Sequence, residues 1–265
     1  MSGPRKRGLA SSLREHREPV RVEADDGVLV VTIDRPEARN AVNLAVAEGI
    51  AAALERLDGE DALRVGVLTG AGGTFCAGMD LKAFVAGERP HVEGRGFAGI
   101  VQGPPRKPLI AAVEGWAVAG GFEIALACDV IVAARDARFG IPEVKRGLVA
   151  AAGALIRLPR RIPHHLAMEL ALTGDPISAE RAFALGLVSR LAEPGEALAA
   201  ARQLAATIAA NGPLAIDATK RILTADEGGA WERQAEIADP VFVSEDAREG
   251  ARAFAEKRPA VWRGR

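Results

Sequence analysis

The sequence contains no tyrosine and only two cysteines, Cys76 and Cys128, among its 265 residues. Two thiols cannot form the framework of a disulfide-rich protein, and no cluster of cysteine and histidine has the spacing of a metal site. The chain also lacks an apolar run long enough to span a membrane, and its first residues carry no apolar segment typical of a secretion signal. These absences predict a cytoplasmic protein that has no bound metal and no contact with membranes.

An excess of either charge is also absent, since 34 Lys and Arg residues stand against 35 Asp and Glu residues. A balanced chain has no general attraction for nucleic acid, so we expect no nucleic-acid partner. Two short basic stretches, "PRKRGLASSLR" and "RLPRRIPHH", are the only candidates for a local basic patch. Residues 1–19 are polar and basic, and we expect them to form a disordered tail.

Histidine is scarce as well, with four residues, and the sequence contains no G-x-S-x-G motif of a serine hydrolase with which they could act. His164 and His165 stand where the pattern predicts the exposed start of a helix. Serine hydrolysis therefore has no support in this sequence.

The pattern of apolar residues predicts an α/β fold. We expect strands at 27–34, 64–70, 108–115 and 129–134, where the residues are apolar and rich in β-branched side chains. Helical spacing indicates helices at 43–58, with Asn43 as N-cap, and at 120–128. Strands and helices alternate to about residue 191, which is typical of a single α/β core. From about residue 195 only helical patterns remain, the last of them capped by Ser244.

Two glycine-rich turns follow predicted strands. The first, "VGVLTGAGGTFCAGMDL" (65–81), suggests a dinucleotide fingerprint, but Phe75 occupies the place of the required third glycine. The second, "EGWAVAGGFEIALACD" (114–129), again combines a strand end, small residues and a helix start. Two such turns can direct backbone N–H groups toward one point, as an oxyanion requires. Either turn could instead close a tight bend and do nothing more.

Two glutamates accompany these turns. Glu123 lies in the first turn of the predicted helix among apolar neighbours, where burial would raise its pKa toward a value useful for acid–base catalysis. Glu143 follows a later strand, in "FGIPEVKRG". An N-terminal helix glutamate can equally serve only to accept backbone hydrogen bonds. The spacing of the two residues does not show whether their side chains meet.

Six segments in the same order resemble the enoyl-CoA hydratase/isomerase (crotonase) superfamily over nearly the whole chain from about residue 20. They are "RPEARNAVN" (35–43), "GAGGTFCAGMDL" (70–81), "KPLIAAVEGWAVAGGFEIALACD" (107–129), "ARFGIPEVKRGL" (137–148), "LTGDPISAERAFALGLVSRL" (172–191) and "AFAEKRPAVW" (253–262). The resemblance implies an α/β fold with a ββα spiral core at 20–194, which holds the active site. It also implies a helical region at 195–265 that mediates oligomerisation and closes the CoA pocket. The expected assembly is a homotrimer, with trimers pairing into hexamers.

The resemblance also assigns residues to the site. It implies that Glu123 orients and deprotonates the water that attacks Cβ, and that Glu143 exchanges the proton at Cα. The N–H groups of Ala77 and Gly120 would bind the thioester oxygen. The candidates for binding substrate and CoA are Arg39, Ala41, Gly78, Asp80, Lys82, Phe254 and Lys257. No cofactor is expected beyond the CoA of the substrate itself.

Possession of both glutamates favours hydration of a trans-2-enoyl-CoA, since isomerases of the family usually keep one. The chain departs from the hydratase pattern at Ala150-Ala151-Ala152, where a glycine that helps to place the water is usual, and at Ala119, where a replaced glycine is expected to be harmless. The segments "GGFEIALA" and "LIRLPRRIP" and the C-terminal end resemble carnitinyl-CoA dehydratases, which give the alternative function. A non-catalytic relative that binds RNA is a third possibility, and it would leave the two glutamates without a role.

Overall fold

The computed structural model describes residues 18–224, 230–261 and 263. The expected disordered tail falls almost wholly on residues 1–17, which lie outside the described residues. Within the described ranges, no helix is long and apolar enough to cross a membrane.

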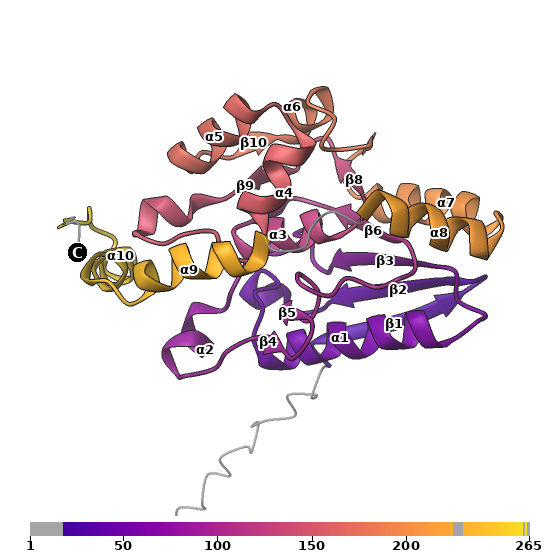
Figure 1. Ribbon diagram of the computed structural model, residues 1–265, viewed down its shortest axis with the longest axis horizontal. Coiled ribbons are helices and arrows are strands. Elements are labelled where there is room, and N and C mark those ends of the chain that lie inside the picture. The colour runs from indigo at the N-terminus through magenta and orange to yellow at the C-terminus, as the bar shows by residue number, and fades with distance from the viewer. Residues whose placement is uncertain (1–17, 225–229, 262, 264–265) are drawn as a thin grey trace, which may run out of the picture.

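The centre of the molecule is a sheet of six described strands in the order β1-β2-β3-β6-β8-β11 (Figure 1). Its strands are β1 (Val20–Asp25), β2 (Val28–Ile33), β3 (Val65–Gly70), β6 (Leu109–Val113), β8 (Val130–Ala134) and β11 (Arg190–Ala192). The hairpin β1–β2 is antiparallel, and every other neighbouring pair is parallel. β2 and β6 are buried along their whole length, as the unbroken apolar pattern of both segments predicts.

A second, smaller sheet in the order β10-β9-β7 follows from short strands between the long ones. Its members are β7 (Trp116–Val118), β9 (Arg138–Gly140) and β10 (Ile177–Ser178). The chain thus passes from β6 through β7 into helix α3 (Gly120–Ala127), and then from β8 through β9 into the 3₁₀ helix η2 (Pro142–Arg146). This repeated strand–strand–helix path is the expected ββα spiral.

Helices cover both faces of the large sheet. Leu29, Val31 and Ile33 of β2 join the main core, to which α1 (Leu44–Gly59) and α3 also contribute. The alternate residues Val28 and Val30 face the opposite way, against α7 (Ala197–Ala209). Although α7 belongs to the region from residue 195, it packs directly on the sheet as part of the core.

The remaining elements surround this centre. They are the 3₁₀ helix η1 (Pro36–Ala38), α2 (Leu81–Val85), β4 (His91–Val92), β5 (Gly96–Phe97), α4 (Ala154–Arg161), α5 (His164–Thr173), α6 (Ala179–Ala184), α8 (Pro213–Thr224), α9 (Ala230–Phe242) and α10 (Glu245–Glu256). In Figure 1, α9 and α10 lie toward the left of the view, and α7 and α8 lie at the right.

Two predicted helix caps are confirmed. The Asn43 side chain accepts a hydrogen bond from the N–H of Val46 at 3.1 Å, and α1 begins at the next residue. Ser244 likewise accepts from the N–H of Ala247 at 2.9 Å at the start of α10. Such caps satisfy backbone donors that a helix leaves unpaired.

Candidate active site

The two glycine-rich turns lie against each other. Cys76 pairs with Ala117 in a parallel bridge, which extends the small sheet to the first turn. A Cβ added to Gly121 would lie 2.1 Å from the carbonyl oxygen of Cys76, and one added to Gly78 would lie 2.9 Å from the Cβ of Ala119, next to Gly120. Both contacts are too close for a side chain, so glycine at these positions allows the two backbones to meet.

The backbone donors of this meeting point differ from the expected pair. The N–H of Ala77 donates to the carbonyl oxygen of Arg39 at 3.1 Å, and it is therefore engaged, contrary to the prediction that it binds a thioester. Among the described residues, the N–H groups of Met79 and Gly120 have no hydrogen-bond acceptor. Met79 follows Gly78, so its N–H lies close to that of Gly120. The pair of unengaged donors is Met79 with Gly120.

Ala119, directly before Gly120, has a strained backbone. Its φ of 52° and ψ of −133° fall in a region that residues with a Cβ rarely adopt. Its N–H donates to Gly140 at 2.9 Å, and its carbonyl accepts from Phe122 and Glu123, so the surrounding structure holds the conformation. The replacement of the usual glycine is therefore not neutral for the backbone.

The carboxylate of Glu123 is buried inside the molecule, where the side chain is held by backbone N–H groups. The residue is 3% exposed, and its Oε1 accepts from the N–H of Ala154 at 3.1 Å. Burial is the largest cause that raises the pKa of this carboxyl, and the negative charge of Glu143 raises it further. The N–H groups of Ala154 and Ala152 and the charge of Arg157 act in the opposite direction.

Glu143 lies in η2, and its charge acts on Glu123. Burial raises its pKa as well, against the opposing charge of Arg146. Its Oε2 atom is buried and has no hydrogen-bond partner among the described residues. Because the charge of Glu143 acts on Glu123, the two carboxylates lie within electrostatic reach of each other. Two such groups in one low-dielectric site favour sharing a single proton at neutral pH.

Arg35 and Asn40 connect the predicted CoA-binding loops, a role that we did not predict. Arg35 donates to the carbonyl of Ala41 at 2.6 Å and to Oδ2 of Asp80 at 3.0 Å. The buried amide of Asn40 donates to the carbonyls of Ala71 and Thr74 at 2.8 Å and 2.6 Å. Both residues stand in the quoted segment "RPEARNAVN", but their hydrogen bonds to Ala71, Thr74 and Asp80 span 31 to 45 residues and leave no local signal.

Asp80 supports its loop through its side chain. Its Oδ1 accepts from the N–H groups of Lys82 and Ala83 and caps α2. Burial alone would raise the pKa of Asp80, but the hydrogen bond from Ala83 and the guanidinium of Arg35 lower it overall. Asp80 is therefore a fixed carboxylate that shapes the turn around Gly78 and Met79.

The other predicted CoA-binding residues fall into two groups. Arg39, Ala41 and Gly78 lie on the loops that Arg35 and Asp80 connect, and Lys82 lies at the start of α2. The side chains of Arg39 and Lys82 are exposed. Phe254 and Lys257 lie at the end of α10, which packs on η2, and the guanidinium of Arg146 lies 4.4 Å from the Phe254 ring. Among the hydrogen bonds of the described residues, none joins the second group to the first.

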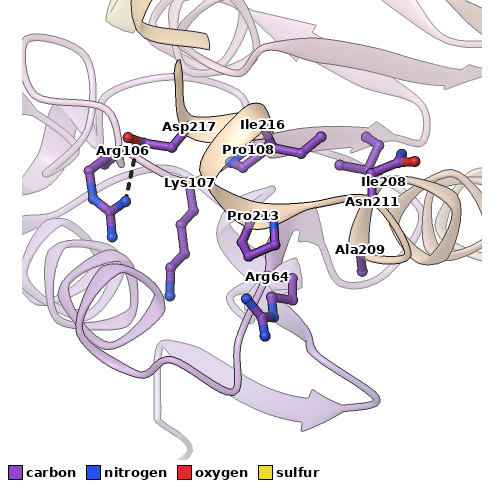
Figure 2. A pocket seen from close by; sticks show the side chains of 10 residues that line it. All are labelled: Arg64, Arg106, Lys107, Pro108, Ile208, Ala209, Asn211, Pro213, Ile216 and Asp217. Atoms are coloured by element: carbon purple, nitrogen blue, oxygen red, sulfur yellow. Dashed lines mark hydrogen bonds and ion pairs between the residues drawn. The ribbon is translucent and has the colours of Figure 1, made fainter. Parts of the chain in front are cut away.

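A small cavity occupies a different part of the molecule (Figure 2). It lies between the α7–α8 turn and the residues that precede β3 and β6, and it is lined by Arg64, Lys107 and Ile216 among others. Asp217 pairs with Arg106 there at 2.9 Å. The described residues contain no group of three histidine, cysteine or acidic side chains that could hold a metal ion.

Comparison with known proteins gives a consistent result. The family model for enoyl-CoA hydratase/isomerase proteins matches residues 23–265. An enoyl-CoA hydratase of Mycobacterium marinum is 61% identical, with 94% of this chain and all of that chain covered, and superposes with a TM-score of 0.78. A carnitinyl-CoA hydratase of Mycobacterium avium is 43% identical over the same shares and superposes with a TM-score of 0.92.

Curated sequences agree with the structures. An enoyl-CoA hydratase of Mycobacterium tuberculosis is 43% identical, with 92% of this chain and 96% of its own length covered. A carnitinyl-CoA dehydratase of Salmonella enteritidis is 40% identical, with 94% and 99% covered. With the family model spanning most of its length and relatives matched from end to end, the chain belongs to the enoyl-CoA hydratase/isomerase family.

Proposed function

We propose that the protein is an enoyl-CoA hydratase, a lyase that adds water to a trans-2-enoyl-CoA and gives a 3-hydroxyacyl-CoA, or runs the reverse dehydration. One observation carries the proposal: the buried carboxylate of Glu123 and the partly buried carboxylate of Glu143 share a site beside the unengaged N–H groups of Met79 and Gly120. The names of the hydratase relatives agree with this function.

In this mechanism the pair of carboxylates carries one proton. Glu123, ionised, takes a proton from water as the water oxygen bonds to Cβ, and Glu143 gives its proton to Cα. Negative charge moves meanwhile to the thioester oxygen, which accepts hydrogen bonds from Met79 and Gly120. Each fixed donor of this kind can contribute about 3–4 kcal/mol in the transition state.

The finer features of the proposal concern binding and assembly. The loops that carry Arg39, Ala41, Asp80 and Lys82 would hold the CoA, and Phe254 and Lys257 would close its pocket, in this chain or in a neighbour. We further propose a homotrimer, with trimers paired into hexamers, that works in the cytoplasm and needs no cofactor.

The test is steady-state hydration of crotonyl-CoA and longer enoyl-CoA thioesters. The assay monitors the loss of the double bond that is conjugated to the thioester. We expect Glu123→Gln and Glu143→Gln each to lower kcat by about 10²–10⁴-fold, the usual contribution of a general acid or base. The exposed Glu169→Gln on α5 serves as the control and should leave kcat unchanged. A loss smaller than tenfold for either site variant would remove the proposed roles.

Carnitinyl-CoA dehydration is the second candidate. It is favoured by the TM-score of 0.92 with the carnitinyl-CoA hydratase of Mycobacterium avium. The chemistry is the same, and the acyl group carries a trimethylammonium that an aromatic or acidic wall would have to accept. Crotonobetainyl-CoA and crotonyl-CoA assayed side by side decide between the two. A higher kcat/KM for the cationic substrate would replace the first proposal with the second.

The RNA-binding alternative loses support from the structure. Of the two basic stretches, "PRKRGLASSLR" lies outside the described residues. The other contains Arg157, which is buried at 3% exposure and so cannot join a solvent-facing stripe.

A further inference from the structure

One buried cation next to the site has no part in the mechanism above. Arg157, in the first turns of α4, is 3% exposed. Its Nη2 donates to the carbonyl oxygen of Val101 at 2.8 Å, and its Cζ lies 5.2 Å from the centre of the Trp231 ring on α9. A buried guanidinium costs free energy unless it is well partnered, so its presence calls for a reason.

The helical turn that contains Arg157 also holds Glu123. The N–H of Arg157 donates to the carbonyl of Gly153 at 3.0 Å and closes the first turn of α4. Ala154, in that same turn, donates its N–H to the Glu123 carboxylate. A Cβ on Gly153 would lie 2.5 Å from Nη1 of Arg157 and 2.7 Å from the Trp231 ring. The guanidinium, the indole and the turn that holds Glu123 therefore pack as one unit.

The hydrogen bond to Val101 links the guanidinium to the loop that follows β5. Val101 lies in the loop after β5, and Phe97 of β5 packs on Gly120, where an added Cβ would be 2.6 Å from the Phe97 ring. Arg157 thus connects the loop beside Gly120 to the turn beside Glu123. A planar guanidinium can donate to a carbonyl and lie over an indole at once, which an ammonium cannot do equally well.

The charges around Glu123 oppose each other. Glu143 in η2 contributes a negative charge, and Arg157 in α4 contributes a positive one. Arg146, also in η2, acts on Glu143. Burial and Glu143 raise the pKa of Glu123 overall, and Arg157 adds to the hydrogen bonds from Ala154 and Ala152 in favouring the ionised form. The proposed mechanism needs that form for removing a proton from water.

We propose that Arg157 is a positioning residue, which holds the α4 turn that binds Glu123 and supplies a positive charge that acts on this carboxylate. The proposal rests on the proposed function, and it concerns Glu123 rather than direct contact with substrate.

The experiment compares Arg157→Met and Arg157→Lys with Arg160→Met, an exposed arginine on the same helix. The pH dependence of kcat for hydration is measured for each. We expect Arg157→Met to lower kcat by about 10- to 100-fold with little change in KM, the scale of a misplaced catalytic group. The acidic limb of the pH profile of kcat should move upward by about one pH unit in this variant, because the positive charge that favours ionised Glu123 has been lost. Arg157→Lys keeps the positive charge, so its acidic limb should lie at the same pH as that of the parent, while its kcat should recover only in part. Arg160→Met should match the parent in both kcat and pH profile.

A second readout does not depend on turnover. The pKa of Glu123 is measured in the unliganded protein by ¹³C NMR of labelled glutamate carboxyls, with the resonance assigned through Glu123→Gln. An upward displacement in Arg157→Met supports the proposal even if the parent protein hydrates no enoyl-CoA, a result that would reject the proposed function alone.

Two outcomes would overturn the inference. The first is a loss of kcat in Arg157→Met with the acidic limb and the Glu123 resonance unmoved, which a purely structural arginine would give. The second is an Arg157→Lys variant whose acidic limb moves as far as that of Arg157→Met. If Arg157→Met fails to fold, Arg157→Lys and Trp231→Leu decide: kcat and limb unchanged in both variants reject a positioning role.

Discussion

At the scale of residues, the shared site of Glu123 and Glu143 makes the stability of the fold depend on pH. Burial raises the pKa of Glu143 above its ordinary value of 4.5, so the folded protein binds this proton more tightly than the unfolded chain. The stabilisation is therefore complete below about pH 4.5 and is lost as the pH rises through the raised pKa.

Glu143→Gln removes this dependence. Relative to the parent, we expect the variant to gain about 1–2 kcal/mol in free energy of unfolding between about pH 5 and pH 8, since one pKa unit corresponds to about 1.4 kcal/mol. Urea denaturation across that range measures the difference. A constant difference at all pH values would show that Glu143 titrates normally in the folded state.

Ala119 offers a second residue-level prediction. A positive φ with a Cβ costs about 1–3 kcal/mol, whereas glycine adds only about 0.4–1 kcal/mol of entropy to the unfolded chain. Ala119→Gly should therefore raise the free energy of unfolding by about 1 kcal/mol in a calorimetric or denaturant experiment. A variant less stable than the parent would mean that the Cβ contacts of Ala119 outweigh the strain.

The sequence predicted the burial of Glu123 but not the finer geometry around it. Glu123 was predictable as a buried acid because apolar residues surround it in a short helix. The choice between Ala77 and Met79 was not, because it depends on whether the Arg39 carbonyl reaches one N–H or the other. The Arg157–Val101 bond joins residues 56 positions apart, and no local pattern encodes it.

At the scale of elements, the most specific contact is between α10 and η2. A Cβ on Gly250 would lie 1.8 Å from the carbonyl oxygen of Arg146, so α10 can pack on η2 only with glycine there. We expect Gly250→Ala to move α10 off η2, to cost about 1–3 kcal/mol of stability as an overpacked contact, and to lower kcat by displacing Glu143.

Gly59→Ala provides the matched control. Gly59 also lies in a helix, and a Cβ added there meets no atom within 4 Å. Alanine should stabilise that helix by up to about 1 kcal/mol and leave kcat unchanged. Thermal denaturation and hydration assays of both variants compare the two sites. Equal stability of Gly250→Ala and Gly59→Ala would show that the contact between α10 and η2 does not contribute to stability.

The long strands could be predicted because each has enough apolar residues to form a pattern, and the short strands could not because they have too few. β2, β3, β6 and β8 are continuous apolar segments, and their observed bounds lie within those predicted at 27–34, 64–70, 108–115 and 129–134. β7 and β9 have three residues each and are defined by pairing across the fold, β7 with β9 and β9 also with β10. Their apolar residues are too few to distinguish a strand from a turn.

At the scale of the whole molecule, α8 leaves apolar side chains exposed. Leu214, Ile222 and Leu223 are 76–86% exposed, and α8 has no buried residue. The predicted trimer would cover such a surface. We expect Leu214→Glu with Leu223→Glu to shift the protein toward smaller species in light scattering coupled to size exclusion. A parent protein that runs as a monomer would refute the predicted assembly.

The packing of α10 on η2 also determines the order in which parts of the site can form during translation. Residues 245–256 leave the ribosome long after the segment that bears Glu143. A nascent chain therefore carries Glu123 and the proposed oxyanion-binding amides of Met79 and Gly120 before Glu143 has its support. Acyl-CoA turnover should therefore begin only when the last helix has emerged. An incomplete translation product could bind a thioester but would lack an aligned proton donor to act on it.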